Sequence, residues 1–150
     1  MLNTRAPGEP YLVERGADQY EYQLPVSVKA VVSWNGRLPL VRNERDEWEL
    51  PGGKLYLGES PADCLSRELQ AELSWDAALG GPHHAWVYQV FPDRHVFVLA
   101  YLASYRGTAA PVHSGGRELV VVTPAEVDAL NMPEDYKLAV RKAAEQGHLG

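Results

Sequence analysis

The apolar residues of this chain follow two different spacings, and the first strongly patterned region has the spacing of a β-strand. Val26–Trp34 is rich in β-branched residues that partly alternate with polar ones, which predicts a strand buried on at least one face. Asn35-Gly36 follows it and is a strong short-range signal for a hairpin turn. Leu38–Val41 supplies the returning strand, so we expect a β-hairpin in the core.

Helical spacing is clearest after Ser60. Ser60-Pro61 joins a good N-cap residue to a residue suited to the first helical position, and Asp63 stands where a capping-box side chain reaches back. Apolar residues then recur at spacings of three and four, which predicts a helix with one buried face. The expected buried residues are Ala62, Leu65, Leu69 and Leu73.

Strand patterns return further along the chain. Gly80-Gly81-Pro82 predicts a turn. His84–Phe91 and His95–Tyr105 alternate and contain aromatic residues, which predicts two core strands joined by a turn at Pro92-Asp93-Arg94.

The last third of the chain predicts a short strand and two helices. After a loop over 107–116, Glu118–Val122 has the composition of a strand. Thr123 and Glu126 form a capping-box pair at the start of the first helix. Pro133–Glu145 is the expected closing helix, and its inward residues are predicted to be Leu138, Ala139 and Ala143.

Residues 1–23 have the character of an N-terminal extension. Prolines and glycines interrupt any long pattern, although Tyr11–Val13 is compatible with a short strand and Tyr20 and Tyr22 with the start of another. We expect this segment to form an edge strand or a dimer arm, and residues 24–150 to form one domain.

Composition and charge narrow the class of protein. The length of 150 residues and the hydrophobic content of 45% fit one soluble domain with a sizeable core. A net charge of −6 argues against general nucleic-acid binding, which needs a basic surface. With one cysteine there is no intrachain disulfide, and neither a signal peptide nor a membrane-spanning run is visible. We therefore expect a cytoplasmic protein with no membrane partner.

The candidate chemistry is concentrated between Gly52 and Glu72. A glycine loop leads to Glu59 just before the helix, and Glu68 and Glu72 stand one turn apart on it. Three carboxylates are thereby expected at one end and one side of a loop–helix unit. Mg²⁺ prefers oxygen ligands and is commonly held by one or two carboxylates together with substrate phosphates, so this stretch predicts a site for a hard divalent cation.

The same stretch resembles the Nudix box. That box is a glycine, five residues, Glu, seven residues, and then Arg-Glu-aliphatic-any-Glu-Glu-any-Gly-aliphatic. The matching residues are Gly53, Glu59, Arg67, Glu68, Leu69 and Glu72. Trp48–Gly53 adds a Trp-x-x-Pro-Gly-Gly run that family members often carry before the box. The resemblance covers about residues 25–145.

The resemblance implies a fold and an activity. We expect an α/β fold of the Nudix type, an α/β/α sandwich with a mixed central sheet and helices on both sides. The implied activity is Mg²⁺- or Mn²⁺-dependent hydrolysis of a pyrophosphate linkage in a nucleoside diphosphate linked to another moiety. The implied partner is a small nucleotide substrate, and a homodimer is possible through the N-terminal arm.

The resemblance also implies roles for individual residues. Metal ligands are expected at Glu68, Glu72 and Gly53, and catalytic roles at Glu68, Arg67 and Glu118, with Glu118 or a box glutamate as general base. Arg67 is expected to clamp Glu59 rather than to contact the substrate. Substrate contacts are expected at Arg42, Gly52, Gly53 and Lys54.

Three positions depart from the box. Ala71 replaces the first Glu of the Glu-Glu pair, which predicts fewer metals, weaker metal binding or no catalysis. Ser74 replaces a glycine that would cap the helix, so we expect the helix to end differently here. Trp75 replaces an aliphatic residue.

Several residues have a simpler alternative to a catalytic role. Cys64 lies within the predicted helix and is expected to be a packing residue rather than a nucleophile. His83 and His84 are adjacent on an extended chain and should point to opposite faces, so they are expected to be structural. The charged run 42–47 is either plain solvated loop or a pocket rim where Arg42 or Arg45 touches phosphate.

Three functions follow from these observations. The first and preferred one is the metal-dependent hydrolase. The second is a non-catalytic nucleotide-binding domain with a degenerate metal site, for which Ala71 is the main argument. The third is a small interaction domain, for which the N-terminal arm is the only indication.

Overall fold

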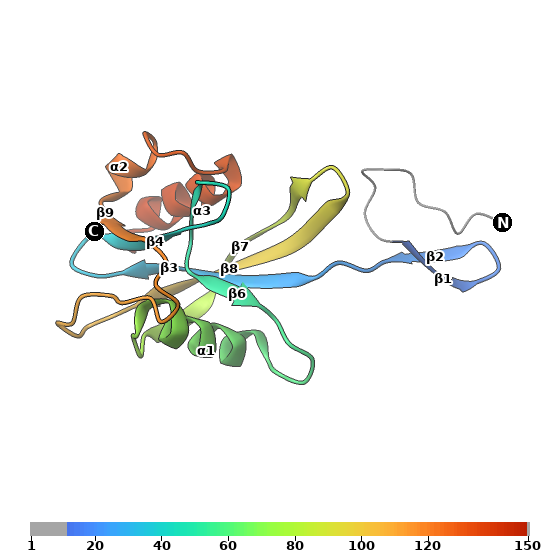
Figure 1. Ribbon diagram of the computed structural model, residues 1–150, viewed down its shortest axis with the longest axis horizontal. Coiled ribbons are helices and arrows are strands. Elements are labelled where there is room, and N and C mark those ends of the chain that lie inside the picture. Colours follow the sequence, from blue (N-terminus) through green and yellow to red (C-terminus); the bar gives the residue numbers. More distant parts are fainter. Residues whose placement is uncertain (1–11, 150) are drawn as a thin grey trace.

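A mixed four-stranded sheet forms the centre of the molecule (Figure 1). The computed structural model describes residues 12–149, and within them this sheet has the order β6-β3-β8-β7. Its strands are β3 (Val26–Ser33), β6 (Gly52–Lys54), β7 (Ala78–Phe91) and β8 (Arg94–Ser104). β3 and β8 are parallel, from Val26 opposite Phe97 to Ser33 opposite Ser104, whereas the other two pairs are antiparallel.

A second sheet has three antiparallel strands in the order β5-β4-β9. They are β4 (Leu38–Arg42), β5 (Trp48–Glu49) and β9 (Leu119–Val122). The predicted strand pair Val26–Trp34 and Leu38–Val41 is thus present, but its two members belong mainly to different sheets. Near the turn a single bridge joins Trp34 to Arg37.

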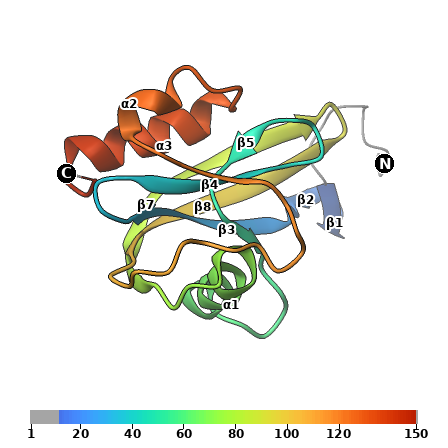
Figure 2. The ribbon, with the colours of Figure 1, turned by 60° about the vertical axis from the view of Figure 1, so that its left-hand side comes forward.

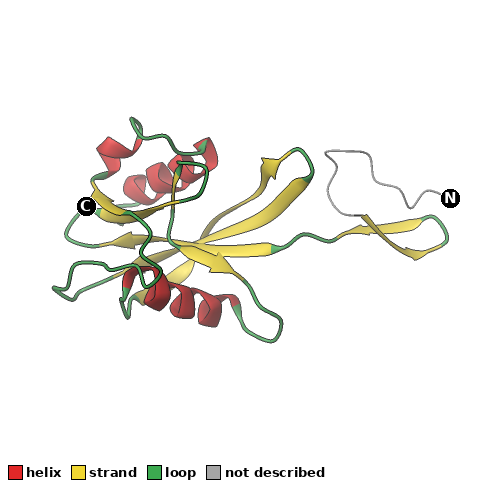
Figure 3. Ribbon diagram, viewed as in Figure 1, coloured by secondary structure: helices red, strands yellow, loops and turns green. Residues whose placement is uncertain are grey.

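Helices cover both sides of the central sheet (Figures 2 and 3). α1 (Pro61–Leu73) lies on one side, and α2 (Pro124–Val127) and α3 (Glu134–Glu145) lie on the other. The expected α/β/α sandwich with a mixed central sheet is therefore confirmed. None of the helices within residues 12–149 is long and apolar enough to cross a membrane.

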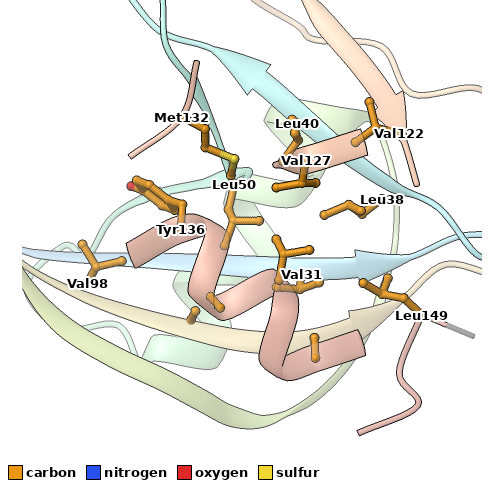
Figure 4. Close-up of a cluster of buried hydrophobic side chains, with 14 of the residues drawn as sticks. Val31, Leu38, Leu40, Leu50, Val98, Val122, Val127, Met132, Tyr136 and Leu149 are labelled. Atoms are coloured by element: carbon orange, nitrogen blue, oxygen red, sulfur yellow. The ribbon is translucent and has the colours of Figure 1, made fainter. Parts of the chain in front are cut away.

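Strand β3 separates two hydrophobic clusters because its side chains alternate between the two faces. Val28, Ala30 and Val32 pack with the apolar stripe of α1. Val31 points to the other cluster, which includes Leu38 of β4 and the buried face of α3 (Figure 4). Each fully buried Val or Leu contributes about 1.5–3 kcal/mol relative to exposure, so burial against β3 helps to hold both helices.

The turn at Asn35-Gly36 is a tight hairpin turn, as predicted. Both residues have positive φ, +53° and +76°, which is typical of the type I′ turn. Trp34 and Arg37 exchange two backbone hydrogen bonds across it, at 2.9 and 3.0 Å. The local sequence is therefore sufficient to explain this part of the fold.

The start of α1 also follows the sequence. Ser60 caps it by accepting the N–H of Asp63 at 3.1 Å, and Pro61 is its first residue. The buried residues, however, are Cys64, Leu65, Leu69 and Leu73, whereas Ala62 is exposed. The prediction for Ala62 was wrong, because Cys64 extends the buried stripe instead.

The end of α1 contradicts the expectation drawn from Ser74. This serine adopts the left-handed conformation (φ +59°) that a capping glycine would take, and its N–H bonds to the carbonyl of Gln70 at 3.0 Å. Its hydroxyl donates to the carbonyl of Val112 at 2.8 Å. This tertiary hydrogen bond supports a conformation that is unfavourable for serine alone. Trp75 beyond it is fully buried and stacks on Tyr105 with ring centroids 4.1 Å apart.

Two further expectations need correction. Gly80-Gly81-Pro82 lies within β7, where the register to β8 shifts on both sides of Pro82, so these residues mark bulges rather than a turn. In α3, Ala139 and Ala143 are buried as predicted, but Leu138 is only half-buried. Tyr136 and Val140 are the larger buried residues of this helix.

The N-terminal segment forms a hairpin of its own. β1 (Leu12–Gly16) and β2 (Gln19–Tyr22) pair with each other and lie apart from the central sheet (Figure 1). Tyr11 and the residues before it are outside the described part of the chain. As described, the hairpin is not an edge strand of the central sheet, and the dimer arm and the boundary between 1–23 and 24–150 stay predictions.

Candidate functional site

Strand β6 lies directly against both β3 and α1 because its two glycines carry no side chains. Gly52 has φ of +142°, and a Cβ atom there would collide with the backbone of Val28 and Lys29. A Cβ atom on Gly53 would overlap the carboxylate of Glu68. Only glycine permits this approach, and it brings Glu68 up to the backbone of β6.

Arg67 ties the loop after β6 to α1. Its Nε and Nη2 donate to the two carboxylate oxygens of Glu59 at 3.2 and 2.7 Å, and its Nη1 donates to Glu68 at 2.5 Å. Nη2 also donates to the carbonyl of Lys54 at 3.1 Å, and the guanidinium lies 4.2 Å from the ring centre of Tyr56. Arg67 therefore connects two carboxylates and the glycine loop in one network.

Glu59 is ionised in this network. Its pKa is lowered to about 2, first by the hydrogen bonds from Arg67 and then by the backbone N–H of Tyr56, which donates at 2.8 Å. A carboxylate that accepts several donors favours its charged form. The Glu59–Arg67 pair therefore persists throughout the neutral and mildly acidic range.

A cavity of about 510 Å³ opens beside this unit, a size typical of sites for small molecules. Five of the predicted site residues line it together. They are Gly52, Gly53 and Lys54 from β6, and Glu68 and Glu72 from α1. The box thus supplies one continuous wall of the cavity.

Glu72 is the carboxylate on this wall that has the fewest partners. Its side chain is 13% exposed, and its Oε2 has no hydrogen-bond partner of acceptable geometry among the described residues. Burial raises its pKa above the ordinary value, while nearby positive charge, above all that of Lys29, acts in the opposite direction. A buried carboxylate oxygen without a well-aligned donor is costly, so this position suits a cation such as Mg²⁺.

The carboxylates do not by themselves enclose an ion. Within residues 12–149, no three His, Cys, Asp or Glu side chains group closely enough to surround a metal. Position 71 also lines the cavity but carries alanine, and Glu68 is turned toward Arg67. A bound Mg²⁺ would complete its coordination with backbone oxygens, water and phosphate, as is usual for this ion.

Lys29 is a buried cation in the cavity wall that the sequence analysis missed. Its side chain is 7% exposed, and its Nζ lies 3.5 Å from Oε1 of Glu49. Asn43 donates to the other oxygen of Glu49 at 3.2 Å. Burial lowers the pKa of Lys29, but Tyr136, Glu49 and other acidic groups outweigh it and raise the pKa above the ordinary value. Lys29 therefore carries a positive charge inside the cavity.

The signal for Lys29 was present in the sequence. It is the one charged residue within the apolar strand Val26–Ser33. A buried lysine is rare unless it is paired, so a lysine in a strand buried on both faces indicates a partner nearby.

Most of the remaining lining comes from residues with no recognisable local motif. The cations there are Arg45, Arg94 and Arg117, and the apolar or aromatic residues are Tyr88, Val90, Val96, Val98 and Tyr136. They come from β7, β8, α3 and two loops. The cavity lining thus combines cations with apolar and aromatic side chains, which suits a ligand with both charged and less polar parts.

Two predicted site residues lie elsewhere. Nη1 of Arg42 donates to Oε2 of Glu118 at 3.1 Å, and Nη2 of Arg42 lies 3.4 Å from Asp46. Glu118 is 60% exposed, and neither Arg42 nor Glu118 lines the cavity. The structure therefore brings these two residues together but not to Glu68 and Glu72, and their roles stay predictions.

The residues for which a structural role was expected do not line the cavity either. Burial raises the pKa of the Cys64 thiol to about 11, which fits packing rather than nucleophilic chemistry. His83 contacts the carbonyl of Ala139, and His84 lies 3.3 Å from Lys142. Both histidines thus face α3, and the expectation of opposite faces was wrong because the register of β7 shifts at this point.

Known proteins similar to this chain share its domain and its fold. The family model described as NUDIX domain matches residues 23–143. An 8-oxo-dGTP diphosphatase from Proteus vulgaris is 36% identical over 66 residues, which are 44% of this chain and 58% of that protein. An 8-oxo-dGTP diphosphatase from Escherichia coli strain K12 is 29% identical over 89 residues, 53% of this chain and 65% of that protein. The chain thus spans less than two thirds of the length of either relative.

The structural comparison agrees. The crystal structure of the MutT protein from Methanosarcina mazei Go1 matches with a TM-score of 0.71 at 19% identity, over 83% of this chain and 95% of that one. At this identity the match concerns the fold alone. The family model covers most of the chain, and the box residues form one loop–helix unit beside a cavity. The chain therefore belongs to the Nudix family.

Proposed function

We propose that this protein is a Mg²⁺-dependent hydrolase that cleaves a pyrophosphate linkage in a nucleoside diphosphate linked to another moiety. The observation that carries the proposal is the shared position of Glu68 and Glu72 on the cavity wall, against the glycines of β6. The two similar bacterial proteins described as 8-oxo-dGTP diphosphatases support a nucleotide as the substrate. A nucleoside triphosphate is within this substrate class.

The residues that would hold the metal are Glu68 and Glu72, with Gly53 as a predicted backbone ligand. Mg²⁺, when bound, supplies positive charge that neutralises pyrophosphate oxygens and orients water for attack. The undersatisfied carboxylate of Glu72 fits this use, because a cation would offset the cost of its burial. Mn²⁺ has similar ligand preferences and is the expected substitute.

The cations of the cavity would bind the remaining phosphate charge. Lys29 is buried and charged, and Lys54 lies on the β6 side of the same cavity. The aromatic residues of the lining, Tyr88 and Tyr136, would receive the less polar part of the substrate. A lining with both cations and aromatic rings agrees with a nucleotide, whose base can stack on an aromatic ring.

Arg67 would act by position rather than by contact with substrate. All of its nitrogen atoms donate to Glu59, Glu68 or the carbonyl of Lys54. It would therefore hold Glu68 and the glycine loop in register for metal binding. For the general base, the predicted candidates were Glu118 and the box glutamates, and of these Glu68 and Glu72 are the ones beside the cavity.

A second candidate is a nucleotide-binding domain without catalysis. The observation that favours it is Ala71, which leaves α1 with two carboxylates on the cavity wall. Such a domain would still bind phosphates through Lys29 and Lys54. The two candidates therefore differ in turnover and not in binding.

A substrate panel with Mg²⁺ tests the proposal. We would incubate the full chain with 8-oxo-dGTP, dGTP, ADP-ribose, a dinucleoside polyphosphate and a UDP-sugar, and follow mononucleotide products by chromatography. Cleavage of at least one compound that stops with excess chelator and returns with added Mg²⁺ is expected. Ligand-induced thermal stabilisation without cleavage of any compound would support the binding domain instead, and cleavage undiminished by chelator would contradict the metal-dependent mechanism.

The expected homodimer and cytoplasmic location are kept as part of this proposal. The hairpin β1–β2 and the residues before it are the proposed contact between two copies. Removal of residues 1–23 followed by sedimentation of both forms would test this, and an unchanged monomer or dimer would contradict a role of the arm in assembly.

A further inference from the structure

The loop between β8 and β9 is fastened to the C-terminal end of α1. The backbone N–H groups of Val112 and Ser114 donate to the carbonyls of Leu73 and Ala71 at 3.0 and 2.9 Å. These contacts hold the residue between them, His113, against the helix. No local pattern in the sequence relates His113 to the box.

The imidazole of His113 is fixed by its own loop. Its Nδ1 accepts the backbone N–H of Gly115 at 2.9 Å and that of Arg117 at 3.3 Å. A ring nitrogen that accepts an N–H carries no proton, so the neutral ring has its proton on Nε2. Nε2 is therefore a donor.

The Nε2 atom of His113 lies 2.9 Å from Oε2 of Glu72. Both side chains are almost enclosed, 12% and 13% exposed. Oε2 has no well-aligned hydrogen-bond partner within residues 12–149, so Nε2 of His113 lies within hydrogen-bond distance of Oε2 without the alignment of a full hydrogen bond. A rotation that brings Nε2–H into line with Oε2 would complete the hydrogen bond and remove the cost of an unsatisfied buried oxygen.

We propose that His113 is a positioning residue for Glu72, whose Oε2 it holds through Nε2–H so that Oε1 faces the cavity. The consequence for metal binding rests on the proposed function, in which Glu72 is a metal ligand. With alanine at position 71, the helix has lost one carboxylate, and the orientation of the remaining one matters more. Groups that orient metal ligands through a hydrogen bond typically contribute 10–100-fold in metal affinity.

This role differs from metal ligation by the histidine itself. A ligating nitrogen needs a free lone pair. As long as Nδ1 accepts from Gly115 and Arg117, the lone pair of the neutral ring is on Nδ1 and Nε2 is protonated. The geometry thus assigns His113 to Glu72 and not to the metal.

The first test concerns the tautomer and needs neither metal nor substrate. Long-range ¹H–¹⁵N correlation spectra of the metal-free full chain resolve the side chains of its five histidines, and the signal absent from His113→Gln identifies His113. The expected result is that the neutral ring of His113 carries its proton on Nε2. A proton on Nδ1 would overturn the proposal, because Nε2 would then be unable to donate.

The second test uses two matched variants. His113→Gln keeps an amide donor near the position of Nε2, whereas His113→Asn keeps an acceptor near the position of Nδ1 and loses the donor. Mn²⁺ binding, measured by the electron paramagnetic resonance signal of free Mn²⁺, should weaken about 10–100-fold in His113→Asn and much less in His113→Gln. Backbone amide spectra of His113→Asn should retain the signals of Gly115 and Arg117, which controls for loss of the loop.

The outcomes separate this inference from the proposed function. Equal weakening in both variants would overturn the donor role, and hyperfine coupling of bound Mn²⁺ to a nitrogen of His113 would show a ligand instead. A protein that has the expected tautomer and variant behaviour but cleaves no nucleotide would contradict the proposed function and leave the role of His113 standing. If no Mn²⁺ binds, the proposed function fails. The tautomer of His113 then decides by itself whether Nε2 can donate to Glu72.

Discussion

Two glutamates one turn apart on α1 face the same cavity but have different surroundings. Glu68 shares Arg67 with Glu59, so its charge is balanced within the loop–helix unit. Glu72 is beside His113, and its Oε2 lacks a hydrogen bond of acceptable geometry among the described residues. The pKa of Glu59 is lowered to about 2 by Arg67, whereas burial raises the pKa of Glu72.

The comparison shows that residue type and spacing do not decide the role of a carboxylate. A carboxylate already paired with a guanidinium gains less from a further cation, and its pair also stabilises local structure. A buried carboxylate without a full set of donors gains more, because a cation offsets its desolvation. We therefore expect substitutions at the two positions to have different consequences for activity and for stability.

The largest effect is expected for Glu72→Gln. This variant keeps the shape of the side chain and removes its charge, so turnover should fall by roughly 10² or more because metal stabilisation of the transition state is weakened. The melting temperature should not fall, since the pKa of Glu72 is raised by burial and the neutral form is the more easily buried one. Steady-state kinetics with Mg²⁺ and a thermal melt at neutral pH measure both quantities.

Normal turnover with normal dependence on Mg²⁺ would contradict this assignment of Glu72. A matched control is Glu44→Gln, which removes a carboxylate from the cavity rim that pairs with Arg117 at 2.7 Å. Its effect on turnover should be much smaller, because this carboxylate is largely exposed and screened.

A smaller loss of activity is expected when the Arg67 network is broken. Arg67→Lys keeps the positive charge but not the planar fork that contacts Glu59 with two nitrogens. Turnover should fall by about 10–100-fold, because Glu68 and the glycine loop lose their orientation. Glu59→Gln should have a similar effect through the same network.

The double variant tests whether these residues act as a unit. The variant that combines Glu59→Gln with Arg67→Lys should have nearly the same turnover as the less active of the two single variants. The reason is that the second change removes a contact that the first has already broken. A loss equal to the product of the two single losses would mean that the residues act independently. Kinetics of all four forms under one set of conditions make this comparison.

Ala71→Glu adds a carboxylate next to Glu72 and tests whether a further ligand strengthens metal binding at this end of the site. Position 71 lines the cavity, so the new side chain can reach the metal ligands. The half-saturating Mg²⁺ concentration should decrease, because the attraction of a divalent ion exceeds the repulsion of one more carboxylate at neutral pH. Turnover measured against Mg²⁺ concentration tests this, and an unchanged or right-shifted curve would show that position 71 does not contribute to the site.

The smallest effect concerns acid stability. Because the pKa of folded Glu59 is about 2, below the ordinary value of 4.5, its contribution to stability is present above about pH 4.5 and is lost as the pH falls toward 2. Glu59→Gln should therefore be less stable than the wild type at pH 7, and the difference should vanish near pH 2. Urea midpoints measured across this range test it, and a difference that stays constant with pH would contradict the role of the Glu59 charge.

The sequence alone determined the elements whose signals are local. The Asn35-Gly36 turn, the Ser60 cap and the stripe Leu65, Leu69 and Leu73 depend on neighbouring residues, so they were predicted correctly. The box residues of β6 and α1 also lie together and line one cavity, because the box is one continuous loop–helix unit.

Tertiary structure decided which residues from other parts of the chain join the box residues around the cavity. Lys29 enters the cavity from β3, and Arg42 pairs with Glu118 away from it, although the sequence suggested otherwise for Arg42. His113 reaches Glu72 through a loop far along the chain. Such contacts depend on how strands and loops pack in three dimensions, and no local spacing encodes them.

Ser74 illustrates the same division within one residue. Its intrinsic preference argues against the left-handed conformation at the end of α1, and the sequence analysis followed that preference. In the folded chain, a hydrogen bond to Val112 and the packing of Trp75 behind it favour this conformation. Local propensity sets a small free-energy bias, and a few tertiary contacts are enough to reverse it.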